Sequence, residues 1–153
     1  MATYRIAWIE DDSHIIEAVV FPLVRLGNTV DRYKSYDEAM RSKDVILVSD
    51  VILLDIIIPR GDDSSKSDLS DPYLGIRLIK DIYEVARQDS RPFPPILILS
   101  AVTNERVIED FKTEFRGTIA ISHLKKPALP STVKERLEQL ISNSKSDRGS
   151  NAT

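Results

Sequence analysis

Acidic residues, a serine and a lysine stand where apolar segments of this chain end. Glu10 and Asp11 follow one such segment, Asp55 interrupts a second, and Ser100 and Lys126 come at or shortly after two others. Carboxylates are preferred ligands of a hard divalent cation, and Mg²⁺ suits a site with few protein ligands and several waters. Serine and lysine can bind phosphoryl oxygens, and a carboxylate beside such a cation can act as a nucleophile toward phosphorus. These residue types therefore indicate magnesium-dependent phosphoryl chemistry, if the fold brings them together.

Alternating strands and helices are the elements that would have to position these side chains. Short runs of apolar and β-branched residues predict five strands, at residues 4–9, 29–33, 51–54, 96–99 and 118–122. Apolar residues at helical spacing predict five helices, at residues 13–26, 35–48, 75–86, 103–115 and 132–142. We therefore expect an α/β fold, a doubly wound parallel sheet with helices on both faces. Parallel strands place their carboxyl ends at one edge, where open α/β sheets bind ligands, so the candidate residues should meet there.

Capping patterns set the expected starts of three helices. Asp12, or the serine after it, can cap the helix that follows the first strand. Ser35 and Glu38 fit a capping box, and so do Thr132 and Glu135. The second and last helices are therefore expected to begin at these two boxes.

The composition narrows the function classes. The 153 residues are expected to form one domain over residues 1–142, followed by a polar tail at 143–153 that we expect to be disordered. The net charge of −3 argues against a nucleic-acid-binding surface, and the absence of cysteine excludes disulfides and thiolate chemistry. No apolar run has the length of a membrane span, and no signal segment precedes the first strand. We expect a soluble, cytoplasmic protein that contacts neither membranes nor nucleic acid directly.

Five motifs, in this order along the chain, carry a resemblance to a known family. They are Ile-Glu-Asp-Asp at 9–12, Leu-Leu-Asp-Ile-Ile-Ile-Pro at 53–59, Gly75 at the start of a helix, Leu-Ser-Ala at 99–101 and Leu-Lys-Lys-Pro at 124–127. Together they resemble the receiver domain of two-component response regulators, over residues 4–142. The resemblance implies a flavodoxin-like, five-stranded sheet of strand order 2-1-3-4-5.

The resemblance also implies roles for the acidic residues. Asp55 matches the phosphoacceptor. Glu10 and Asp11 match the acidic pair that binds Mg²⁺, together with Asp55 and the backbone carbonyl of Ile57. Asp12 is expected to cap the helix instead, and a slip of one residue would exchange it with Glu10 in the metal site. Such a domain is not a conventional enzyme, although it would catalyse its own aspartyl phosphorylation and slow dephosphorylation.

Five residues are implied to control the phosphorylated state. Ser100 matches the switch hydroxyl that bonds the phosphoryl group, and Lys126 matches the lysine that contacts a phosphoryl oxygen. His123 falls where the family usually has an aromatic switch residue. Ile57 and Val102 match the positions that flank the path of the attacking water. Both are apolar and bulky and can neither orient nor activate a water molecule, so we expect dephosphorylation to be slow.

Two function classes remain open. One is a stand-alone response regulator, phosphorylated by a histidine kinase or phosphotransfer protein. It would signal through a downstream protein or a homodimer on the face formed by the fourth helix, fifth strand and last helix. The other is a receiver-like interaction module that works without phosphorylation. The acidic set favours the first, because a module without phosphate would not need mutually repelling carboxylates. The polar segment between Pro59 and Gly75 is longer than the family usually has, and we expect a mobile loop there.

Overall fold

The computed structural model of the chain describes residues 3–61, 71–101 and 105–150. Within these residues the chain forms a five-stranded, all-parallel sheet in the order β2-β1-β3-β4-β5. The strands are β1 (Arg5–Ile9), β2 (Thr29–Tyr33), β3 (Val51–Leu54), β4 (Ile96–Ser100) and β5 (Ile121–Lys125). The predicted flavodoxin-like sheet and its strand order are confirmed.

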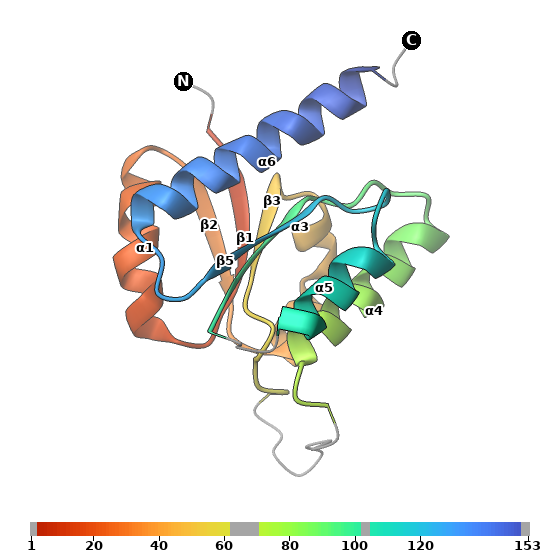
Figure 1. Ribbon diagram of the computed structural model, residues 1–153, viewed down its shortest axis with the longest axis horizontal. Helices are drawn as coiled ribbons and strands as arrows, with labels where there is room; N and C mark the ends of the chain where they lie inside the picture. The colour runs from red at the N-terminus through yellow and green to blue at the C-terminus, as the bar shows by residue number, and fades with distance from the viewer. Residues whose placement is uncertain (1–2, 62–70, 102–104, 151–153) are drawn as a thin grey trace.

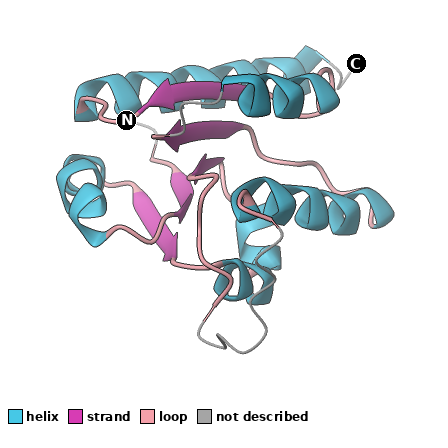
Figure 2. Ribbon diagram, turned by 60° about the horizontal axis from the view of Figure 1, so that its bottom comes forward, coloured by secondary structure: helices cyan, strands magenta, loops and turns pink. Residues whose placement is uncertain are grey.

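Helices cover both faces of this sheet (Figures 1 and 2). In the described part of the chain they are α1 (Ser13–Arg25), α2 (Tyr36–Arg41), α3 (Lys43–Leu47), α4 (Leu74–Gln88), α5 (Glu105–Glu114) and α6 (Pro130–Ser150). α1 and α6 pack on one face, and α2 to α5 pack on the other. Along β1, Ile6 and Trp8 belong to the hydrophobic core under α1 and α6. Ala7 and Ile9 belong to the core under α2 to α5, as the two-residue period of a strand requires. Burial on both faces accounts for the nearly continuous apolar runs of the three inner strands β1, β3 and β4.

The fifth strand lies further along the chain than the predicted range 118–122 and runs from Ile121 to Lys125. Gly117 adopts a φ of 80°, and the N–H of Ile119 donates to the carbonyl of Phe115 at 3.0 Å. These features commit the backbone to a turn after α5. Ile119 is therefore part of the turn, and its side chain is buried there. The residues that pair with β4 begin at Ile121.

The single helix predicted for residues 35–48 is divided into α2 and α3 at Ser42. Ser35 caps α2 as predicted, since its hydroxyl accepts a hydrogen bond of 3.1 Å from the N–H of Glu38. The Glu38 carboxylate accepts from the N–H of Lys34 instead of completing the box. Ser42 leaves helical geometry, with φ −115° and ψ 22°. Serine disfavours helix interiors because its hydroxyl competes for backbone hydrogen bonds, which suits it to this break.

The last helix begins earlier than predicted. α6 starts at Pro130, whose fixed φ and missing N–H suit the first position of a helix. The N–H of Thr132 donates to the carbonyl of Leu129 at 3.0 Å, so Thr132 already belongs to the first turn. The capping box predicted for Thr132 and Glu135 is therefore wrong, because proline sets the start of the helix before the threonine is reached.

The last helix also ends later than predicted. α6 continues to Ser150, so residues 143–150, which we expected to be disordered, are helical (Figure 1). No proline or glycine interrupts the sequence between Pro130 and Gly149, and the Lys145 ammonium lies 5.5 Å from the centre of the Tyr4 ring. None of the described helices, α6 included, is long and apolar enough to cross a membrane.

Candidate functional site

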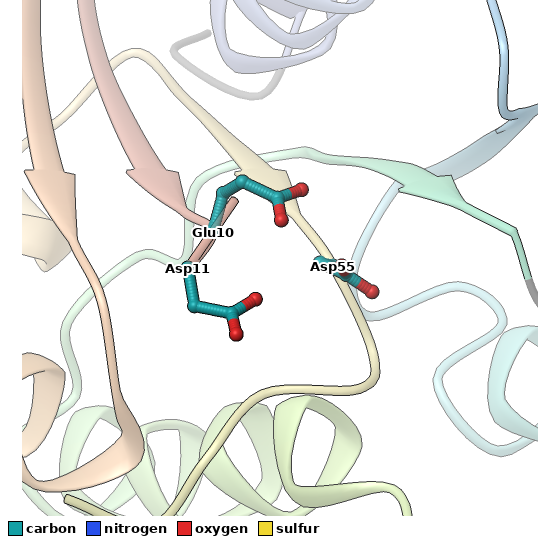
Figure 3. A group of neighbouring side chains, drawn as sticks. All are labelled: Glu10, Asp11 and Asp55. Carbon is teal, nitrogen blue, oxygen red and sulfur yellow. The ribbon is translucent and has the colours of Figure 1, made fainter. Parts of the chain in front are cut away.

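The carboxyl ends of four parallel strands bring the candidate residues to one edge of the sheet. Glu10 and Asp11 follow β1, Asp55 follows β3, Ser100 ends β4 and Lys126 follows β5. Carboxylate oxygens of Glu10, Asp11 and Asp55 lie within 4.8 Å of one another. Figure 3 shows these three side chains gathered at the ends of β1 and β3. We call them the acidic cluster. The structure thus brings together the residues that the sequence predicted to meet.

Asp12 has a different role from the two residues before it. Its side chain accepts a hydrogen bond of 3.0 Å from the N–H of His14 and caps α1. Its own N–H donates to Oε1 of Glu10 at 3.1 Å. Glu10 is fully buried, whereas Asp12 is exposed. Of the two alternatives left open by the sequence, the structure therefore places Glu10 in the acidic cluster and Asp12 at the helix cap.

Three neighbours hold the carboxylate of Asp55. Its Oδ1 accepts hydrogen bonds from the N–H of Ile57 at 3.0 Å and from the hydroxyl of Ser100 at 3.3 Å. Its Oδ2 lies 3.0 Å from Nζ of Lys126. Asp55 is buried, with 8% of its surface exposed. These three contacts hold the carboxylate in a defined orientation.

Lys126 joins the acidic cluster from the β5 side. The N–H of Lys126 donates to the carbonyl of Ser100 at 3.0 Å, which fixes the backbone where it leaves β5. Its Nζ lies 2.7 Å from Oε2 of Glu10 and 3.0 Å from Oδ2 of Asp55, and the side chain is only 12% exposed. Two buried carboxylates thus share one ammonium. With Asp11 nearby, negative charge exceeds positive charge at this edge when all three acids are ionised.

The pKa values of Glu10 and Lys126 are both shifted by their surroundings in the site. Burial raises the pKa of Glu10 from 4.5 to about 6; the hydrogen bond from Lys126 opposes this rise, and the charge of Asp55 adds to it. Burial acts to lower the pKa of Lys126, but its hydrogen bonds to Glu10 and Asp55, and their charges, outweigh burial and raise that pKa. Lys126 is therefore a fixed positive charge near neutral pH. An added cation would relieve the repulsion between the acids.

Helix α4 starts directly against the backbone of Asp55 because residue 75 is a glycine. The N–H of Gly75 donates to the carbonyl of Ile56 at 3.0 Å. A Cβ at Gly75 would overlap the carbonyl oxygen of Asp55 and lie 2.6 Å from the Cα of Ile56. The missing side chain therefore permits a close approach between helix and strand end.

Three of the predicted site residues are less well defined by the structure. His123 lies on β5, half-buried and paired with Ile98, and its Nε2 is buried without a hydrogen-bond partner among the described residues. Burial, followed by the charge of Lys112, lowers the pKa of His123. Ile57 is 51% exposed beside Asp55, and the contact seen there is made by its N–H. The carbonyl of Ile57 therefore remains a predicted ligand, and Val102 lies outside the described residues.

The sequence interpretation missed Arg32. This residue lies on β2, paired in register with Trp8 of β1. Its guanidinium donates to the backbone carbonyls of Glu10 at 3.4 Å and Asp11 at 3.2 Å. From the sequence, only Tyr33 and Lys34 were expected at the end of this strand. The available signal was a long basic side chain near the carboxyl end of the predicted second strand, at residues 29–33.

Comparison with known proteins supports the fold through solved structures. No protein-family model and no curated protein matches the chain. A CheY-like response regulator receiver domain protein from Methanospirillum hungatei is 15% identical with a TM-score of 0.67, over 95% of this chain and 99% of that one. CheY4, a chemotaxis response regulator of Vibrio cholerae, is 22% identical with a TM-score of 0.65, over 91% and 99% of the two chains. NtrX from Brucella abortus is 17% identical with a TM-score of 0.72 over 98% of this chain. The chain spans only 30% of NtrX.

These matches define the class of fold. The chain has the fold of CheY-like response regulator receiver domains, so the resemblance inferred from the five motifs is confirmed at the level of the fold. At identities of 15 to 22%, the likeness concerns the fold alone. In this chain the acidic cluster lies at the carboxyl edge of that fold, and its carboxylate oxygens are close enough together to bind a divalent cation.

Proposed function

We propose that this chain is a phosphorylatable receiver domain of a two-component system, in which Asp55 accepts a phosphoryl group from a phosphohistidine. The convergence of the acidic cluster with Lys126 at one edge of the sheet is the observation that carries the proposal. The fold shared with CheY-like receiver domains supports it. In this proposal the phosphodonor is a histidine kinase or phosphotransfer protein, and the domain acts in the cytoplasm.

The residues present fit a bound Mg²⁺. Glu10, Asp11 and Asp55 offer carboxylate oxygens within 4.8 Å of one another, and hard oxygen ligands of this kind suit magnesium. The backbone carbonyl of Ile57 is proposed as a further ligand. When bound, Mg²⁺ would neutralise negative charge on the phosphoryl group during transfer.

The chain's own side chains have defined parts in the proposed transfer. A carboxylate oxygen of Asp55 forms a bond to phosphorus while the bond from phosphorus to the donor imidazole nitrogen breaks, and the electron pair of that bond stays on the imidazole. Lys126, already 3.0 Å from Oδ2 of Asp55, supplies a positive charge to a phosphoryl oxygen. Ser100, whose hydroxyl contacts Oδ1 of Asp55, supplies a hydrogen bond to the phosphorylated side chain.

A cavity next to Lys126 supports approach of a donor protein. The cavity has a volume of about 480 Å³ and a mainly apolar lining that includes His14, Ala18, Ala101, Lys126 and Pro127. Ala101 is small and exposed and follows Ser100, whose hydroxyl contacts Asp55, so its side chain would not obstruct the phosphohistidine of a partner. The signal would leave through the face formed by α5, β5 and α6, which includes His123, toward a downstream protein or a second copy of the domain.

The alternative is a receiver-like interaction module that acts without phosphorylation. The observation in its favour is that Lys126 already bonds both Glu10 and Asp55, so these two carboxylates have a partner without any cation. Phosphorylation distinguishes the two proposals directly.

The test is the intact mass of the protein after incubation with Mg²⁺ and acetyl phosphate. We expect wild type to gain the mass of one phosphoryl group, Asp55→Asn to gain none, and Asp89→Asn to behave as wild type, because Asp89 caps the distant end of α4. If Asp55→Asn gains the same mass, the assignment of the phosphoacceptor is wrong. If wild type gains no phosphoryl group from acetyl phosphate or from phosphohistidine donors, the proposal of an interaction module that acts without phosphorylation is favoured.

A further inference from the structure

Arg32 makes a pair of contacts with the main chain of the acidic cluster. From β2 its Nε approaches the carbonyl oxygen of Glu10 at 3.4 Å, and its Nη2 approaches the carbonyl oxygen of Asp11 at 3.2 Å. Each bond is long, but the donors belong to one rigid, planar guanidinium, so the two carbonyls are held in a fixed relation to each other. Both acceptors are backbone atoms of residues whose side chains form the acidic cluster.

The charge of Arg32 is not used in an ion pair within the described residues. The same two strands show a contrast at their other end. There Arg5 of β1 pairs with Asp31 of β2, with Nε 2.9 Å from Oδ2. Arg32 instead directs its donors to the main chain of Glu10 and Asp11, so its contacts serve the shape of this turn.

Asp11 is the member of the acidic cluster that needs this support. The carboxylate of Glu10 is held by Lys126 and by the N–H of Asp12. For the exposed carboxylate of Asp11, no hydrogen bond occurs among the described residues. Its direction therefore depends on the backbone of the turn. The cap formed by Asp12 ties this backbone to α1, and Arg32 ties it to β2.

We propose that Arg32 is a positioning residue for the cation site: its guanidinium holds the main chain of Glu10 and Asp11 so that both carboxylates face Asp55 before the cation binds. This inference rests on the proposed function of the acidic cluster as a Mg²⁺ site. Outer-shell groups that orient metal ligands typically change metal affinity by about 10- to 100-fold when they are removed. The exposed contact to Asp11 places Arg32 at the lower end of that range.

The direction in which Mg²⁺ affinity changes when Arg32 is replaced distinguishes a positioning role from an effect of its charge alone. A positive guanidinium near a cation site repels the cation, so removing it for its charge alone would tighten Mg²⁺ binding or leave it unchanged. Removing a group that orients the ligands weakens binding, because the turn must then be ordered when the cation binds. Lysine at this position keeps the charge but presents one nitrogen in place of the planar fork, so Arg32→Lys should not restore affinity.

The experiment is calorimetric titration of Mg²⁺ into the full chain and its variants. Relative to wild type, we expect the Kd to rise about tenfold in Arg32→Met, which keeps an unbranched apolar stem, and to rise also in Arg32→Lys. Arg5→Met should match wild type, since it removes an arginine from the far end of the same strands. Urea unfolding without metal checks that each variant is folded. If Arg32→Met or Arg32→Lys is not folded, Arg32→Gln is titrated in its place.

Two results would overturn the inference for different reasons. Mg²⁺ binding by wild type that is lost in Asp11→Asn but equal or tighter in Arg32→Met would leave the cation site standing and remove the role of Arg32. Absence of Mg²⁺ binding by wild type would overturn the proposed cation site and the positioning role together.

Discussion

Replacing Lys126 with methionine should destabilise the metal-free protein by about 3 kcal/mol at about pH 8, because removal of one partner leaves buried charge uncompensated. The Lys126 side chain is 12% exposed, and the side chains of its partners Glu10 and Asp55 are 1% and 10% exposed. Water therefore has little access to replace the lost ammonium. Methionine retains much of the apolar stem of lysine, so the change removes mainly the charge and its hydrogen bonds.

The loss should be smaller in acid because of Glu10. Burial raises the pKa of Glu10 to about 6, above its ordinary 4.5, so the folded protein binds this proton more tightly than the unfolded chain does. The contribution of Glu10 to stability therefore falls as pH rises from about 4.5 to about 6 and is constant above that range. Without Lys126 the hydrogen bond that opposes this shift is absent, so the pKa of Glu10 rises further. The difference between Lys126→Met and wild type should thus be smaller at about pH 5 than at about pH 8.

Urea unfolding followed by the fluorescence of Trp8, the only tryptophan, measures these free energies. Lys125→Met is the matched control, since the neighbouring Lys125 is exposed and should change the unfolding free energy little. Adding Glu10→Gln to Lys126→Met should recover part of the loss, because one uncompensated carboxylate is then removed. The reasoning is refuted if Lys126→Met costs no more than Lys125→Met, or costs the same at both pH values.

Three further variants test the backbone contact and the lifetime of the phosphorylated state. Gly75→Ala should destabilise the protein by about 1–3 kcal/mol, because the added Cβ would overlap the backbone of Asp55 and Ile56. Alanine normally stabilises a helix relative to glycine, so the expected sign is the opposite of the helix propensity. Equal or greater stability in urea unfolding would show that α4 can move away from the strand end. Ile57→Asn and Val102→Glu should speed loss of the phosphoryl group by a factor that can reach about 10²-fold, since the resemblance to receiver domains implies that both positions flank the path of the attacking water, and a polar group there could orient it. Mass spectrometry of the phosphorylated protein over time measures this rate, and decay equal to wild type would contradict the proposed exclusion of water.

Short sequence patterns correctly predicted those strands and helix starts that depend on neighbouring residues in the chain. The apolar runs located the first four strands, and Ser35 marked the start of α2. The pattern failed where neighbouring backbone decided the outcome. Ile119 looks like strand, yet its N–H is committed to a turn that Gly117 begins. Pro130 starts α6 ahead of the capping box, because its ring fixes φ for the first helical position.

The sequence by itself determined which residue types follow the strands, and hence which chemistry this edge of the sheet can support. Only the tertiary structure decided how those groups meet. Lys126 and Glu10 are 116 positions apart in the chain, and their hydrogen bond depends on the packing of β5, β4, β3 and β1 side by side. The choice of Glu10 over Asp12, and the contact of Arg32 with the turn, likewise depend on side-chain directions and neighbouring strands. Spacing along the chain does not specify such distances, because they arise from the register between strands.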